Sequence, residues 1–192
     1  MSRFLTVEIR LAFVETHVDA RGEGGGPERQ DEVDRLVAAW RRELPDLDVS
    51  PLEVLSRVTR LARHLDRARR NVFSAHDLEP WEFDVLTALR RAGPPYELSP
   101  GRLITQTLVT SGTMTNRIDR LAAKGLVERR PEPADRRGVR VRLTLEGQRR
   151  VDAALAALLD HERTLLAGLP DDDRAHLAAL LRRLLLPFDE RT

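Results

Sequence analysis

The segment from Leu98 to Thr144 constrains the fold more than any other part of the chain, because its patterns follow a fixed order. One apolar helix pattern is followed by a short break and by a second helix pattern that opens with the small polar residues Thr110–Thr113. Two alternating segments, Leu126–Arg130 and Val139–Leu143, then predict paired strands joined by a charged turn, Asp135–Gly138. This order predicts a winged helix-turn-helix.

The second helix of this motif has one apolar face and one polar face. Met114, Ile118, Leu121 and Ala122 recur at helical spacing and predict the buried face, and we expect Gly125 to end the helix in a left-handed conformation. We expect Ser111 to cap its N-terminus.

The polar face of this helix and the charged turn predict contacts with duplex DNA. Asparagine can pair with adenine and arginine with guanine, a helix N-terminus can hold a phosphate, and a wing arginine can enter a narrow minor groove. The residues expected to contact DNA are Ser111, Thr113, Thr115, Asn116, Arg120, Arg136 and Arg137. The alternative is a solvated helix face and an ordinary charged hairpin tip.

The basic residues are concentrated in the same region. Between Arg117 and Arg150 there are eleven basic and five acidic residues, a local charge of +6, although the whole chain carries only +1. A basic face on an otherwise acidic body suits a protein that binds DNA.

The remaining patterns predict a mainly α protein in which the wing is the only sheet. Helices are expected over Asp31–Glu43, from Pro51 to about Ser74, from Pro80 to about Ala92, from Thr144 to about Leu166 and from about Asp171 to Leu186. We expect residues 1–30, which contain a glycine-rich stretch, to be a flexible arm before one domain over 31–192. Within that domain we expect N-terminal helices over 31–79, the DNA-binding lobe over 80–144 and dimerisation helices over 145–192. Leucine-rich terminal helices predict a homodimer, whose two motifs would meet the half-sites of a pseudo-palindromic operator.

Several classes of protein are disfavoured by the composition. The chain has no cysteine, which excludes disulfides and thiolate chemistry, and its five histidines lack the spacing of a metal site. No constellation typical of a hydrolase or a nucleotide-binding enzyme is present, so we expect neither catalysis nor a cofactor. Without an apolar run of about 20 residues or a signal-peptide pattern, we expect a cytoplasmic protein that does not enter the membrane.

The residues of the motif resemble the MarR family of transcriptional regulators. The wing sequence Asp135-Arg136-Arg137 followed by Val141-Arg142-Leu143-Thr144 is similar to the family's wing signature. The runs Asn116–Leu121 and Lys124–Val127 resemble its recognition helix and the exit from that helix. The resemblance covers roughly residues 50–186 and implies a dimeric winged helix-turn-helix regulator that responds to a small molecule.

An additional N-terminal helix that carries Trp40 resembles the urate-responsive subgroup of this family, the PecS and HucR type. The resemblance implies a site for urate or a related purine. By position it would consist of Trp40, Asp84, Arg117 and Arg129. Two guanidinium groups, a carboxylate and an aromatic wall suit a flat anionic purine.

The expected mechanism is that a ligand bridging these residues moves the recognition helix and releases the DNA. The structural alternative is that Trp40 packs in a core and that Asp84 is a buried carboxylate paired with Arg117 or Arg129. Two functional alternatives remain: a MarR-type regulator that responds to a phenolic or organic acid, and a DNA-binding scaffold protein that responds to no ligand.

Overall fold

Helices account for most of the computed structural model, which describes residues 30–132 and 135–189, without the side chains of 135–137. The chain divides within α2 into two compact units, one ending at Arg57 and one beginning at Val58. None of the described helices is long and apolar enough to cross a membrane.

The first unit consists of α1, Glu32–Glu43, and the beginning of α2, Pro51–Ala75. Asp31 caps α1 by accepting hydrogen bonds from the backbone N–H groups of Val33 and Asp34. Arg57 then pairs with Asp31 at 2.8 Å and with Asp34 at 2.6 Å. The hydrogen bond from Arg57 and those from the helix backbone lower the pKa of Asp31 to about 2. The start of α1 is therefore tied to the first turns of α2.

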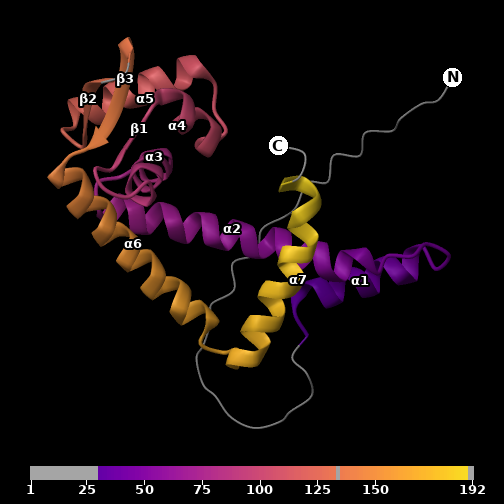
Figure 1. Ribbon diagram of the computed structural model, residues 1–192. Coiled ribbons are helices and arrows are strands. Elements are labelled where there is room, and N and C mark those ends of the chain that lie inside the picture. The colour runs from indigo at the N-terminus through magenta and orange to yellow at the C-terminus, as the bar shows by residue number, and fades with distance from the viewer. Residues whose placement is uncertain (1–29, 133–134, 190–192) are drawn as a thin grey trace, which may run out of the picture. The chain divides into compact units, whose positions relative to one another are not determined.

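The second unit carries the winged motif on a helical scaffold (Figure 1). After α2, its elements follow in the order α3 Pro80–Arg91, β1 Glu97–Leu98, α4 Pro100–Thr107, α5 Ser111–Ala123, β2 Val127–Glu132, β3 Asp135–Leu143, α6 Leu145–Leu166 and α7 Asp171–Asp189. The three strands form an antiparallel sheet in the order β1-β3-β2. The predicted fold class, mainly helical with a small wing, is confirmed.

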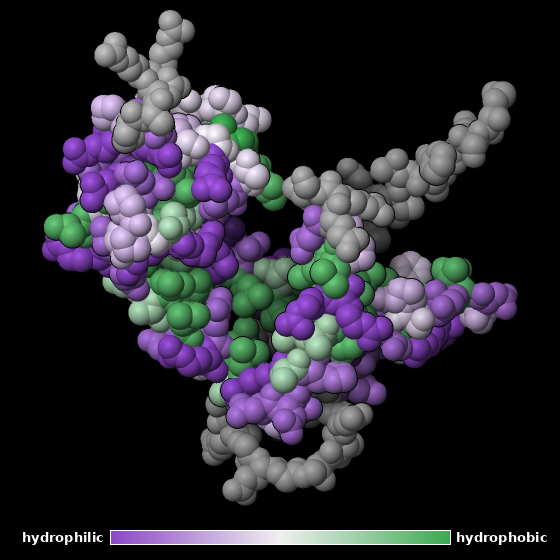
Figure 2. Space-filling model, in the orientation of Figure 1, coloured by the Kyte–Doolittle hydropathy of each residue, from purple (hydrophilic) through white to green (hydrophobic). Residues whose placement is uncertain are grey.

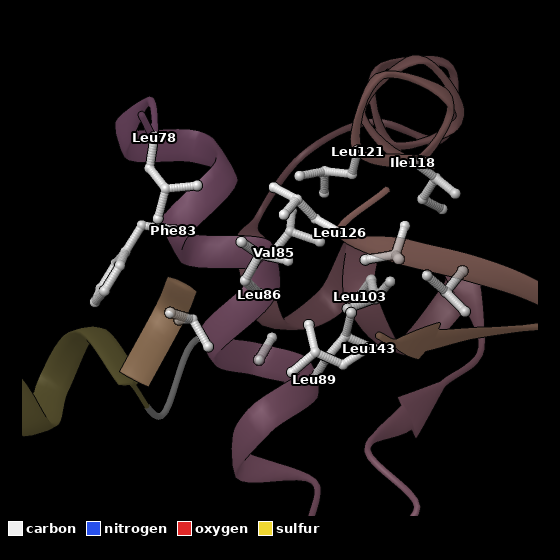
Figure 3. Close-up of a cluster of buried hydrophobic side chains, with 14 of the residues drawn as sticks. Leu78, Phe83, Val85, Leu86, Leu89, Leu103, Ile118, Leu121, Leu126 and Leu143 are labelled. Carbon is white, nitrogen blue, oxygen red and sulfur yellow. The ribbon is translucent and has the colours of Figure 1, made fainter. Parts of the chain in front are cut away.

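The core of this unit forms around α3, most of whose residues are buried (Figure 3). Leu86 and Leu89 of α3 are fully buried together with Leu103 of α4, Leu121 of α5 and Leu143 of β3. Each element of the motif contributes at least one side chain to this core. Burial of a side chain of this size contributes about 1.5–3 kcal/mol, so the core fixes how α4, α5 and the sheet are arranged.

The predicted helices agree with the structure within a few residues, two local predictions are wrong, and one strand was missed. Thr110 rather than Ser111 caps α5, because Thr110 is the extended residue whose hydroxyl accepts from the N–H of Thr113. Strands β2 and β3 continue to Glu132 and from Asp135, so the expected turn over 135–138 belongs to β3. Strand β1 was not expected at all, since two residues are too short to show alternation.

Helix α7 differs from the other described helices because none of its residues is buried. Six leucines and a phenylalanine on it are exposed: Leu177, Leu180, Leu181, Leu184, Leu185, Leu186 and Phe188. Figure 2 shows hydrophobic surface along α7 and α6, whereas the surface of the winged lobe is mostly hydrophilic.

Candidate DNA-binding face and effector residues

Helix α5 presents its polar face to solvent because its apolar face packs in the core. Met114, Ile118 and Leu121 are buried, as predicted, and Ala122 is half-buried. On the opposite face, Ser111, Thr113, Thr115, Asn116 and Arg120 are all exposed. The helix ends at Ala123, and Gly125, two residues later, has a φ of 69°, the left-handed conformation predicted for it.

The hydroxyl groups at the start of α5 are oriented by local hydrogen bonds. The hydroxyls of Thr110 and Thr113 lie 2.9 Å apart, and Thr115 donates to the carbonyl of Ser111 at 3.2 Å. Within the described residues, Asn116 makes no side-chain hydrogen bond. The first turns of α5 therefore present ordered hydroxyl groups and one amide that is available to a ligand.

The N-terminus of α3 holds the second half of α5 through oppositely charged side chains. Arg120 donates to Glu79 at 2.8 Å, and its guanidinium lies 4.8 Å from the centre of the Trp81 ring. Trp81 donates its indole N–H to the second oxygen of Glu79 at 2.5 Å. This hydrogen bond, followed by the charges of Arg120 and Lys124, lowers the pKa of Glu79, so its carboxylate stays ionised.

One turn further along α5, a second ion pair is anchored in the core. Lys124 donates to Glu82 at 2.9 Å, and the Glu82 side chain is fully buried. The same Glu82 oxygen accepts from the backbone N–H of Glu79 at 2.9 Å, as expected for the third residue of a capped helix. Two consecutive turns of α5 are thus attached to the first turn of α3.

The wing is an antiparallel hairpin whose register shifts between Pro131 and Glu132, and its exposed surface is charged. Arg129 lies opposite Val141 and Arg130 opposite Arg140 in the ladder. Arg140 is paired with the half-buried Glu132, and this hydrogen bond raises the pKa of Arg140. The side chains of Arg136 and Arg137, predicted to contact DNA, lie outside the described residues.

Comparison with known proteins identifies the group to which this architecture belongs. Residues 76–138, which run from the end of α2 into the wing, match the model described as "MarR family". The transcriptional regulator PecS of Dickeya dadantii is 39% identical over 153 residues, which are 80% of this chain and 92% of PecS. The chain belongs to the MarR family.

Solved MarR-family structures agree with this assignment. A mutant MarR from E. coli complexed with operator DNA is 30% identical, with a TM-score of 0.59 over 76% of this chain and 97% of that one. Bordetella bronchiseptica BpsR, whose DNA binding is regulated by 6-hydroxynicotinic acid, is 28% identical, with a TM-score of 0.52 over 67% of this chain and 98% of that one. The present MarR-family protein is a DNA-binding transcriptional regulator rather than an enzyme, as predicted.

The four residues expected to bind an effector have different surroundings in this MarR-family chain. Trp40 lies on α1 in the first unit and is 39% exposed, so it is not simply a core residue. In the second unit, Asp84 faces Arg69 at 3.8 Å, and Arg129 is paired with Asp119 at 2.6 Å. Arg117 is half-buried, with its guanidinium 5.3 Å from the centre of the Trp81 ring.

The predicted structural alternative for Asp84 is wrong in two respects. Its partner is Arg69 of α2 rather than Arg117 or Arg129, and its side chain is 52% exposed rather than buried. Both differences arise because Asp84 lies on an exposed side of α3, next to Arg69 of α2. Asp84, Arg117 and Arg129 are thus each engaged by a different exposed or half-buried neighbour.

Sequence reasoning did not single out Glu79, Glu82 or Lys124. The sequence feature that could have identified them is the spacing of basic residues. Arg117, Arg120 and Lys124 lie on one side of α5 at intervals of three and four residues. Such a basic stripe needs acidic partners where it meets a neighbouring helix, and the run Glu79-Pro80-Trp81-Glu82 supplies them.

Proposed function

We propose that this MarR-family regulator is a cytoplasmic repressor that binds a pseudo-palindromic operator as a homodimer and is released by urate or a related purine. The observation that carries the proposal is the exposed polar face of α5, whose position is fixed by the core and by two ion pairs with α3. The recognition helix of a helix-turn-helix protein contacts base edges in the major groove, mainly through its N-terminal residues.

The contacts assigned to DNA follow from the exposed groups. Ser111, Thr113 and Thr115 would bind phosphates or bases near the helix N-terminus, and Asn116 would read an adenine. Arg120 would read a guanine, while Arg136 and Arg137 of the wing would contact the minor groove. The E. coli MarR complex supports this proposal, because that relative is described bound to operator DNA.

Four side chains are proposed to bind the effector: Trp40, Asp84, Arg117 and Arg129. The similarity to PecS over most of both chains supports a shared effector class. Arg117 and Arg129 belong to α5 and β2, so an anion that draws them away from Trp81 and Asp119 would also move the DNA-binding lobe. A change of a few kcal/mol in coupling free energy is enough to release the operator.

The test is a fluorescence-anisotropy titration with a labelled duplex from upstream of the gene, repeated with urate, salicylate and 6-hydroxynicotinic acid. Urate is expected to weaken DNA binding at lower concentration than either organic acid. If 6-hydroxynicotinic acid, the effector named for BpsR, is the more effective, the effector is an organic acid instead.

Two variants locate the effector site. Arg129→Ala is expected to bind the duplex normally and to respond weakly to urate. Asp119→Ala is expected to respond to less urate, because Asp119 no longer competes with the ligand for Arg129. The control is Arg130→Ala on the same strand, whose partner is Glu128. Unchanged urate sensitivity in both Arg129→Ala and Asp119→Ala would reject the assignment.

A further inference from the structure

The guanidinium group of Arg120 is held from two directions on the DNA-binding side of α5. Its Nη2 donates to Oε1 of Glu79 at 2.8 Å, and the Trp81 ring lies beneath the guanidinium at 4.8 Å. Because Oε2 of Glu79 accepts from the indole N–H at 2.5 Å, the three side chains form a closed triangle. Glu79 and Arg120 are nevertheless each about half exposed, with 51% of the side-chain surface accessible.

An exposed ion pair of this kind contributes little to stability. Its geometry is more informative than its strength. The carboxylate is fixed by the indole N–H, the plane of the guanidinium by the ring, and the backbone of α5 by the buried Glu82–Lys124 pair one turn away. These contacts therefore favour one rotamer of an arginine that would otherwise sample many.

Most of the donors of this arginine remain available. A guanidinium has five N–H groups, and in the described structure one of its nitrogens, Nη2, donates a hydrogen bond. Recognition of a guanine through O6 and N7 needs two donors on one edge. Immobilising a free arginine side chain on binding costs conformational entropy, and this cost is reduced if the protein has already ordered the side chain.

We propose that Glu79 and Trp81 are positioning residues that hold Arg120 ready to read one guanine in each operator half-site. The inference rests on the proposed contact of Arg120 with operator DNA. It adds that the carboxylate of Glu79 lowers the affinity for DNA of arbitrary sequence, because it brings a negative charge close to the phosphates. Glu79 thus strengthens specific binding and weakens non-specific binding.

The test compares wild type and Glu79→Gln on two duplexes, the operator and a scrambled sequence of the same length. Glu79→Gln keeps the size of the side chain and removes its charge. Operator affinity is expected to fall about tenfold, within the range of one arginine–guanine contact. Affinity for the scrambled duplex is expected to rise. Trp81→Phe, which keeps a ring and removes the indole N–H, should change the ratio in the same direction.

A modified base identifies the contact. Replacing each operator guanine in turn by 7-deazaguanine, which lacks the N7 acceptor, should weaken wild-type binding at one symmetry-related position. Glu79→Gln and Arg120→Ala should both lose sensitivity at that position, and Glu79→Gln should have no further effect on operator affinity when added to Arg120→Ala. Glu128→Gln, which removes another exposed carboxylate paired with an arginine, is the matched control and should change both affinities in parallel.

The results distinguish a failure of the positioning role from a failure of the proposed contact between Arg120 and DNA. If wild type binds the operator and Arg120→Ala binds it equally well, the positioning role and the proposed contact of Arg120 are both rejected, while the regulator assignment stands. If Arg120→Ala weakens binding but Glu79→Gln leaves the ratio of the two affinities unchanged, only the positioning role is rejected. Equal increases on both duplexes would mean that Glu79 only repels DNA, which also overturns the proposal.

Discussion

At the scale of single residues, Glu82 of the DNA-binding lobe is a buried carboxylate whose hydrogen bonds are incomplete. It is fully buried, and its Oε1 atom has no hydrogen-bond partner among the described residues. Its other oxygen accepts from Lys124 and from the backbone N–H of Glu79. A buried carboxylate without a full set of partners is costly, and the ion pair with Lys124 offsets part of that cost.

Removing Lys124 should therefore destabilise the protein more than its exposure of 35% suggests. We expect Lys124→Met to lower the free energy of unfolding by about 2–4 kcal/mol, because Glu82 is left buried without its cation. The double variant Glu82→Met/Lys124→Met should recover most of the loss. Urea denaturation measures both. As a control, Arg130→Met breaks an exposed pair and should cost less than about 1 kcal/mol. A double variant as unstable as Lys124→Met would show that the pair itself is stabilising.

At the scale of elements, the exit from α5 is tied to the start of α6. Thr144 caps α6, and its hydroxyl lies 2.8 Å from the carbonyl of Gly125 and 3.1 Å from that of Leu126. Gly147, in the first turn of α6, packs directly on Leu126, because a Cβ there would lie 2.1 Å from the Leu126 carbonyl oxygen. The segment that leaves the recognition helix and the first turn of α6 therefore meet at a backbone contact that leaves no space for a side chain.

Gly147→Ala should force these two elements apart. Neither neighbouring backbone can yield by the required distance without shifting α6, so we expect a loss of stability of about 2 kcal/mol or more, the scale of overpacking in a core. Gly101→Ala, at another helical glycine where the nearest atom is 4.0 Å away, should be neutral or slightly stabilising. Thermal unfolding of the two variants, together with operator affinity, is the measurement. Equal stability of the two variants would contradict the close contact.

Some features of these elements could be predicted from the sequence and others could not. The faces of α5 were predictable because periodicity and packing impose the same pattern on Met114, Ile118 and Leu121. The extent of the wing was not, because β2 lies at the sheet edge, where Pro131 and charged residues are tolerated in a strand. The contacts that Glu79 and Trp81 make with Arg120 depend on how α3 meets α5, so local sequence does not specify them. The effector residues came from a family resemblance rather than from spacing.

At the scale of the whole molecule, α7 has an apolar surface that is exposed in the described part of a single chain. Leu177, Leu181, Leu184 and Phe188 follow one side of the helix at intervals of three or four residues, and all are exposed. Exposed apolar stripes of this length are typical of protein–protein interfaces. A second copy of the chain is the proposed partner, because a two-fold dimer places two recognition helices on successive turns of DNA.

Leu181→Glu/Leu184→Glu is expected to give monomers, because two carboxylates would be buried in the dimer interface without partners. The monomers should bind the operator at least 100-fold more weakly, since each would engage only one half-site. Light scattering coupled to size-exclusion chromatography measures the mass, and anisotropy measures the affinity. The control is Ala175→Glu/Ala179→Glu, which adds the same charge on the opposite side of α7 at two exposed positions. If the leucine variant stays dimeric, the interface is not on α7. If it is monomeric but binds the operator as tightly as wild type, the two-fold arrangement on DNA is rejected.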